Sequence, residues 1–336
     1  MADQDAKVRA FLAGQRTHFI FASYPLTGAY NEAVPEMHRL GFDNYPRLEV
    51  GPGFFFLEQL LGCTLKVVDG HTGSFFHTFC EPVSATVGAG VSAGEALRGV
   101  AWRGYRDSVK RALDAAGLAL PVDFLTFSPF DCACNVYGTQ RFLSALVDDP
   151  QGAADALARV SDLFLACCED LGAHGIKLTN PYGFESLYCN DLQLCALSPG
   201  HIARFVLPVY QALAKASRGL IAAFNFHDIG LVREAMGIEG LIGCAVDRRV
   251  PLAEIREMLG SRLFVANSYL YDDTTDRPFL RDGQWWNPIV QTHGRGLAEV
   301  WAALADKCSL LVTVERPSLA EVCRVQNDLR AVAALR

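Results

Sequence analysis

Short apolar runs rich in β-forming residues recur along the chain, and an amphipathic stretch with helical periodicity follows most of them. The runs that we interpret as strands are 19–23, 64–69, 123–129, 175–180, 220–228, 241–247, 262–269 and 309–316. The clearest helical stretches between them are 151–173, 199–217 and 251–260. Alternation of this kind predicts a parallel sheet whose outer face is covered by helices.

The number of strands predicts one large barrel. Eight runs that are apolar throughout and end on polar residues fit a (β/α)8 barrel, or TIM barrel, as a single α/β domain over 1–336. The region 24–120 does not divide into clean strand–helix units, so we expect it to carry insertions and extra helices. A doubly wound open sheet is the alternative, but no Gly-x-Gly-x-x-Gly pattern follows the first strand.

Polar side chains at the strand ends form the candidate site, because barrels of this kind carry their chemistry at the carboxyl ends of the strands. The residue types are one histidine with several carboxylates and carboxamides, and few lysines. We expect catalytic or substrate-binding roles for Tyr24, Ser128, Asp131, Asn180, Asn225, His227, Asp247, Asn267 and Glu315.

Period-two alternation in the fifth predicted strand places Asn225 and His227 on the inner face and the neighbouring phenylalanines under the helices. His227 is therefore a candidate metal ligand or acid–base group. The alternative is a neutral imidazole that bonds to a backbone carbonyl or to Asp247. Glu315, in the last strand, is either a second ligand or acid–base group or a partner for Arg316.

The loop after the fourth predicted strand should lie above the barrel mouth, where loop residues of barrel enzymes meet their substrates. Its candidate substrate contacts are Tyr182, Glu185, Tyr188 and Cys189. Among these, Cys189 is the candidate catalytic thiolate.

The composition indicates which binding partners and which cellular compartment to expect. The 336 residues carry a net charge of −7 with a pI near 5.6, which argues against nucleic-acid or anionic-membrane partners. No apolar run reaches the roughly 18 residues of a membrane span, and the first residues lack the apolar core of a signal peptide. We therefore expect the 11 cysteines to be reduced thiols of a cytoplasmic protein.

Several ordered segments resemble the uroporphyrinogen decarboxylase superfamily, which also contains zinc-dependent methyltransferases acting on methylated corrinoid proteins. The segments are SPFDCACNVYGTQRFLSALVDDPQGAADALARV (128–160), LSPGHIARFVLPVYQAL (197–213), VDRRVPLAEIREMLGSRLFVANS (246–268) and ERPSLAEV (315–322). This resemblance implies a TIM barrel. TGAYNEA (27–33) and FFLEQLLGCTLKVVDG (55–70) look more like the methyltransferase branch.

The chain departs from both branches at their functional positions. The decarboxylases carry an arginine-rich substrate-binding segment and a catalytic aspartate, whereas this chain lacks the arginine pair and has Asn180, which cannot ionise. The methyltransferases bind zinc with a His-x-Cys motif and a later cysteine. Here His227 matches the histidine, but Ile229 and Glu315 stand where the resemblance implies cysteines.

A nitrogen and oxygen ligand set at His227 and Glu315 would suit zinc, iron or manganese; loss of the metal is the alternative. The sequence thus predicts a metal-dependent methyl, alkyl or carbon transferase that acts on a small molecule at the barrel mouth, with a corrinoid or corrinoid protein as the methyl donor. One alternative is a metal-free decarboxylase of a small acid or tetrapyrrole-like compound, which would need no cofactor. The other is a non-catalytic barrel that binds a corrinoid, another ligand or a partner protein.

Overall fold

The chain divides into two compact units, one of residues 1–46 and 242–336 and one of residues 47–241. Its single-domain organisation stays a prediction. The computed structural model describes residues 2–23, 30–40, 42–43, 47–48, 55–67, 78–83, 86–117, 120–124, 126–180, 184–191, 193–224, 228–246, 249–265, 279–281, 284–286 and 295–315.

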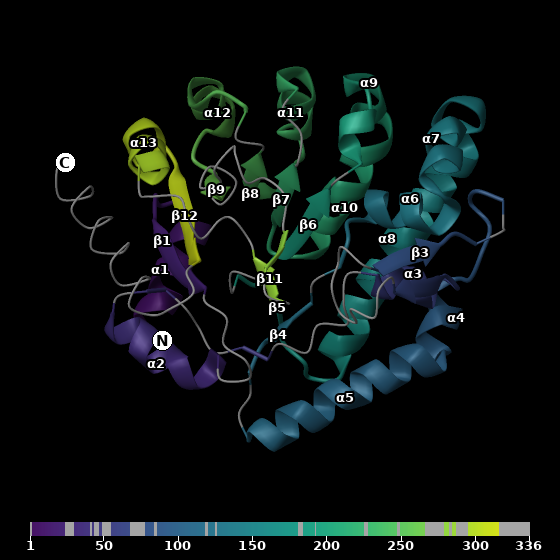
Figure 1. Cartoon of the computed structure of the whole chain (residues 1–336), viewed down its shortest axis with the longest axis horizontal. Helices are drawn as coiled ribbons and strands as arrows, with labels where there is room; N and C mark the ends of the chain where they lie inside the picture. The colour runs from purple at the N-terminus through teal and green to yellow at the C-terminus, as the bar shows by residue number, and fades with distance from the viewer. Residues whose placement is uncertain are drawn as a thin grey trace. The chain divides into compact units, whose positions relative to one another are not determined.

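The first unit contains a parallel sheet in the order β1, β12, β9, β8 (Figure 1). Its strands are β1 (Phe19–Ser23), β12 (Ser309–Glu315), β9 (Leu263–Val265) and β8 (Leu241–Val246). β1 pairs with β12 along its whole length, from Phe19 opposite Leu311 to Ser23 opposite Glu315. The predicted strands 19–23 and 309–316 are thereby confirmed over their described residues, 19–23 and 309–315, and Phe19 and Leu311 are fully buried.

Helices and one hairpin complete the first unit. They are α1 (Ala2–Leu12), α2 (Tyr30–Arg39), α12 (Leu252–Leu259), α13 (Arg295–Leu304), β10 (Phe279–Arg281) and β11 (Gln284–Trp286). Helix α13 packs against β12 and α12. Helix α12 begins directly after Pro251 and ends at Gly260, whose φ of 61° is left-handed, so the predicted punctuation of this helix is confirmed.

The second unit contains short parallel strand pairs and one antiparallel hairpin. Strand β4 (Val122–Asp123) pairs with β5 (Leu178–Thr179), and β6 (Leu187–Asp191) pairs with β7 (Leu220–Phe224). The hairpin joins β2 (Thr64–Val67) to β3 (Thr78–Glu81). Because β6 and β7 are in register from Leu187 opposite Leu220 to Asp191 opposite Phe224, they end at the same edge.

Helices of the second unit pack on these strands and on one another. They are α3 (Phe56–Leu60), α4 (Ala93–Arg98), α5 (Val100–Ala116), α6 (Pro129–Tyr137), α7 (Thr139–Asp148), α8 (Pro150–Ala173), η2 (Leu194–Ala196), α9 (Pro199–His201), η3 (Ile202–Val206), α10 (Leu207–Ala216) and α11 (Ile229–Ala235). Helices α6, α7 and α8 contact each other, and α10 lies against α8 and β7 (Figure 1). The predicted helices 151–173 and 199–217 are confirmed, the second with a π-helical turn, η3, in it.

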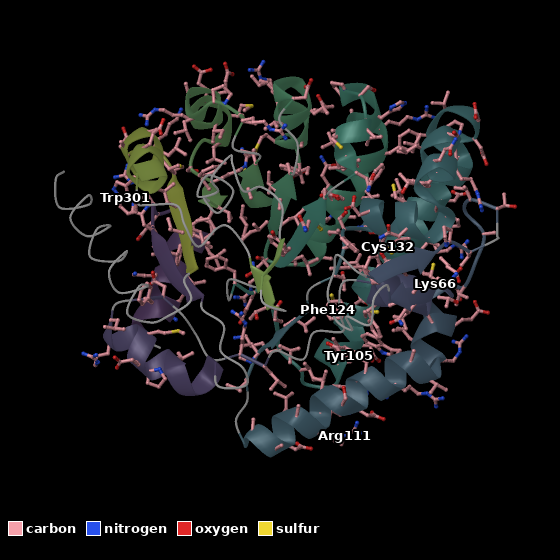
Figure 2. The ribbon with its side chains drawn as sticks, viewed as in Figure 1. Lys66, Tyr105, Arg111, Phe124, Cys132 and Trp301 are labelled. Carbon is pink, nitrogen blue, oxygen red and sulfur yellow. The ribbon has the colours of Figure 1, made fainter. Side chains whose placement is uncertain are left out.

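An aromatic core holds α5 in the second unit. Trp102 is fully buried, and its indole nitrogen Nε1 donates a hydrogen bond to Asp170 Oδ2 at 2.8 Å. The rings of Tyr105 and Phe124, labelled in Figure 2, lie 6.3 Å apart, and Phe164 packs against Phe124. Helix α5 is amphipathic, so its opposite face carries the polar residues.

The structure corrects three strand predictions. In the predicted strand 64–69, Thr64–Val67 forms one arm of an antiparallel hairpin, not a strand of the parallel sheet. In 123–129 only the beginning is strand, because Ser128 caps helix α6 and Pro129 starts it. The predicted loop 185–191 contains strand β6, since pairing with the buried β7 outweighs the low strand propensity of Asn190 and Asp191.

The observed architecture is mixed α/β with parallel strands. Among the described residues no set of strands closes into a barrel. In the same part of the chain, every helix is too short or too polar to cross a membrane.

Candidate functional site

A serine at the start of α6 connects this helix to the carboxyl end of β6. The Ser128 Oγ accepts a hydrogen bond from the Asp131 amide at 3.2 Å, which caps the helix. The same hydroxyl donates a hydrogen bond to the carboxylate of Asp191, the last residue of β6. One hydroxyl therefore fixes the helix start against the strand end.

Four polar residues meet at this edge, and we call Ser128, Asp131, Asp191 and Tyr210 the Asp191 cluster. The Tyr210 hydroxyl, on α10, donates a second hydrogen bond to Asp191. The backbone amide of Gln193 donates to Asp131 Oδ1 at 3.0 Å. All four cluster residues are almost fully buried, with Ser128, Asp191 and Tyr210 at 0% exposure and Asp131 at 2%.

Burial raises the pKa values of Asp191 and Tyr210 in the cluster. It raises the pKa of Asp191 well above its usual range, and the nearby charge of Asp131 raises it further, although the two hydroxyl donors oppose the shift. Burial and the Asp191 charge likewise raise the pKa of Tyr210. Asp191 therefore binds a proton more strongly than an exposed carboxylate does, and it lies beside two hydroxyls.

Two cysteines border the Asp191 cluster. Cys189 lies two residues before Asp191 in β6, on the same face of the strand, and is fully buried. Burial and the charges of Asp191 and Asp131 raise the pKa of the Cys189 thiol, and the pKa of Cys134 on α6 is raised for the same reasons. These directions favour protonated thiols over a thiolate at Cys189, whose catalytic role stays a prediction.

A π-helical turn precedes Tyr210. Ser198 caps α9 by accepting from the His201 amide at 3.3 Å, and the helix continues through η3 into α10. Pro208, near the start of α10, has no amide hydrogen to donate, so the helix cannot keep its regular hydrogen bonds there. The wider turn sets the register with which Tyr210 reaches Asp191.

Sequence reasoning found half of the Asp191 cluster. It selected Ser128 and Asp131, which the structure brings together with Asp191 and Tyr210. It missed Asp191 because LYCND was interpreted as a loop, although its apolar residues alternate as in a strand. It missed Tyr210, for which the signal was a tyrosine on an otherwise apolar helix face, since a buried hydroxyl needs a partner.

Other predicted residues lie away from this cluster. Asn180 is buried and closes the turn after β5, where its Nδ2 donates to Ser186 Oγ at 2.9 Å and its Oδ1 accepts from the Phe184 amide at 3.2 Å. Glu185 precedes β6 at the opposite end from Asp191, and Tyr188 lies on the other face of that strand from Cys189. These three therefore do not join Ser128 and Asp131, and their functional roles stay predictions.

The remaining candidates fall outside the described residues. They are Tyr24, Tyr182, Asn225, His227, Asp247 and Asn267. Asn225 and His227 follow Phe224 directly along the chain, and Phe224 is the register partner of Asp191. The backbone of Glu315 ends β12 opposite Ser23, while its side chain is outside the described part.

The described side chains do not form a metal site. Among them, no three His, Cys, Asp or Glu residues have an arrangement that could hold a metal ion. The predicted ligand His227 and the side chain of Glu315 lie outside the described residues, so the zinc ligation that the resemblance implies stays a prediction, and we derive no step through a metal.

The fold over the whole chain is similar to that of a methyltransferase from Methanosarcina mazei. The TM-score is 0.66 at 12% sequence identity, and the match covers 99% of this chain and 98% of that one. Neither a protein-family model nor a curated protein sequence matches the chain. At this identity the likeness shows a shared fold, and the superfamily stays a prediction.

Proposed function

We propose that this protein is a methyltransferase-like enzyme that moves a methyl or other alkyl group to or from a small molecule. The observation that carries the proposal is the Asp191 cluster at the carboxyl end of β6, in a chain that shares its whole fold with a methyltransferase. Parallel α/β folds bind their ligands beyond the carboxyl ends of their strands.

The cluster has the groups that such a transfer needs. When a thiol or amine accepts a methyl group, its sulfur or nitrogen forms a bond to the methyl carbon, the bond from that carbon to the donor breaks with its electron pair staying on the donor, and the acceptor releases a proton. Burial raises the pKa of Asp191, so its carboxylate binds such a proton more strongly than an exposed carboxylate does. The Ser128 and Tyr210 hydroxyls already donate hydrogen bonds to this carboxylate and fix its position as the base that takes the proton.

The proposal also concerns the complete fold and the methyl donor. The complete chain would form a (β/α)8 barrel whose mouth contains the Asp191 cluster, with Asn225 and His227 beside it. A corrinoid, free or on a corrinoid protein, would supply the methyl group. The support is the family resemblance, together with the chain order that takes β7 from Phe224, opposite Asp191, into 225–227.

A methyl-transfer assay tests the proposal. Methylcob(III)alamin is mixed with the purified protein and a panel of small thiols and amines, and loss of the carbon–cobalt bond is followed in the visible spectrum. We expect turnover with at least one acceptor. Release of carbon dioxide from a tetrapyrrole acid without demethylation would favour the decarboxylase, and binding without turnover would favour a non-catalytic barrel. Either result would contradict the proposal.

A separate experiment tests whether the protein binds a metal through His227. Elemental analysis compares the wild type with His227→Ala and, as a control histidine, His174→Ala at the end of α8. A near-stoichiometric metal that is lost only from His227→Ala would support ligation by His227. The same metal content in all proteins would contradict it.

A further inference from the structure

A cavity of about 530 Å³ lies at the amino end of β6, at the opposite end of this strand from Asp191. It is lined by helix α8, by the amino ends of β5 and β6, and by the residues that follow α10. Small-molecule sites in proteins have volumes of roughly 300–1,000 Å³. The cavity is therefore large enough for a small organic ligand.

Part of the cavity wall is apolar. Leu165 on α8, Leu178 in β5 and Leu187 in β6 line it, and each of them is only partly buried. Ala216, the last residue of α10, is exposed and adds to the same wall. Covering partly exposed apolar surface is favourable in water. A ligand with an apolar body would therefore gain free energy by lying against these side chains.

The rim of the cavity carries two cations that share one carboxylate. Glu185 pairs with Lys177 through Oε1 and with Arg218 through Oε2, the latter at 3.0 Å. The described residues provide no other ion-pair partner for either cation, and the two side chains are 61% and 70% exposed. Because both cations are held on one carboxylate and keep further N–H groups, a second carboxylate can bind across them.

A buried hydroxyl lies next to this rim. Ser186 follows Glu185 directly, lines the cavity and is only 6% exposed. Its Oγ accepts a hydrogen bond from Asn180 Nδ2 at 2.9 Å, and no acceptor for the hydroxyl hydrogen is present in the described part of the chain. A buried hydroxyl with an unused hydrogen can donate to an anionic ligand.

The charges at the rim favour a ligand with one negative charge. Lys177 and Arg218 against Glu185 leave a single net positive charge. The exposed Glu169 on α8 also lines the cavity and disfavours a second negative charge on the ligand. A carboxylate carries one negative charge and matches the planar guanidinium group of arginine, whereas a phosphate group carries close to two.

We propose that this cavity binds a small monocarboxylic acid with an apolar body. The ligand carboxylate accepts hydrogen bonds from Lys177, Arg218 and the Ser186 hydroxyl, and the apolar body covers the leucine side chains. The cavity lies at the amino end of β6, so this binding does not depend on the methyl transfer that we propose at the carboxyl end.

A comparison of two ligands tests the proposal on the full-length wild-type protein. Binding of 3-phenylpropanoate and of its neutral analogue 3-phenylpropanamide is measured by ligand-observed NMR titration. For a ligand of this size we expect a Kd on the order of 1 mM for the acid. The amide should bind at least about tenfold more weakly, because it cannot form charge-assisted hydrogen bonds with the two cations.

Three variants locate the binding site. Arg218→Gln and Lys177→Gln each remove one rim cation and should weaken binding of the acid at least about fivefold. The control Arg111→Gln removes an exposed cation on α5, labelled in Figure 2, and should bind the acid as the wild type does. Circular dichroism shows whether each variant is folded, and the comparison of acid with amide needs no variant.

Four results would each overturn the proposal. They are absence of saturable binding of the acid, equal affinity for acid and amide, tighter binding of inorganic phosphate than of the acid, and wild-type affinity in folded Arg218→Gln and Lys177→Gln.

Discussion

The two ends of strand β6 carry carboxylates in opposite environments. At the carboxyl end, Asp191 is fully buried and accepts hydrogen bonds from the Ser128 and Tyr210 hydroxyls. Before the amino end, Glu185 is 33% exposed and forms ion pairs with Lys177 and, at 3.0 Å, with Arg218. Asp191 thus accepts hydrogen bonds from neutral hydroxyls away from water, whereas Glu185 pairs with cations near the solvent.

This difference in environment distinguishes the candidate catalytic site at Asp191 from the surface ion pairs at Glu185. Glu185, Lys177 and Arg218 line a cavity of about 530 Å³, and the two cations are 61% and 70% exposed, so solvent screens their attraction. At Asp191 water is excluded, which shifts its pKa and makes each missing partner costly. The environment at each end of β6 thus determines whether the carboxylate there can take part in chemistry.

Removing the buried carboxylate should have the largest effect. Asp191→Ala leaves the Ser128 and Tyr210 hydroxyls buried without their acceptor, so we expect the free energy of unfolding to fall by about 4 kcal/mol. Urea denaturation at neutral pH measures this. The exposed Asp155→Ala on α8 is the control and should differ from wild type by less than about 0.5 kcal/mol. Similar small losses in both variants would show that the cluster does not hold α6, β6 and α10 together.

Glu58 extends the comparison to a second buried carboxylate. Burial raises its pKa from 4.5 to about 7, although Asn135 donates to it. This group favours folding fully below about pH 4.5, and the stability falls as pH rises through about 7, because the unfolded state releases its proton first. The total loss is about 3 kcal/mol.

Glu58→Gln should remove this pH dependence. Urea denaturation at about pH 5 and about pH 8 is expected to show a smaller stability difference for the variant than for wild type, by about 3 kcal/mol. Glu257→Gln, on the exposed side of α12, is the control and should keep the wild-type difference. An unchanged difference in Glu58→Gln would mean that Glu58 does not titrate in this way.

Neutralising the exposed partner should have the smallest effect. Glu185→Gln keeps the side-chain shape and removes the ion pairs with Lys177 and Arg218, so we expect a loss of at most about 1 kcal/mol. Added salt should reduce even this difference, since it screens exposed charges. A loss as large as that of Asp191→Ala would erase the distinction between the two ends of β6.

The sequence predicted elements whose signals are local. Strands β1 and β12 are continuous apolar runs, and helix α12 carries its own start and stop residues, Pro251 and Gly260. Ser128 and Asp131 were found because they are polar residues at the end of a predicted apolar strand, where the chemistry of barrel enzymes lies.

The rest depends on contacts between distant segments. Asn190 and Asp191 disfavour a strand locally, and only the pairing with β7 makes β6 one. Helical periodicity identifies the face on which Tyr210 lies, but it does not say that Asp191 is the partner. The antiparallel pairing of β2 with β3 was missed for the same reason, because the sequence alone had predicted a strand of the parallel sheet there.

The most direct test of the account is the methyl-transfer rate of Asp191→Asn, which keeps the shape of the side chain while removing the carboxylate that takes the proton. With methylcob(III)alamin and the best acceptor at saturation, we expect the rate to fall about 100-fold, whereas the exposed Asp155→Asn should keep the wild-type rate. Circular dichroism confirms that both variants are folded. A folded Asp191→Asn protein with the wild-type rate would contradict the claim that the carboxyl end of β6 is where the chemistry takes place.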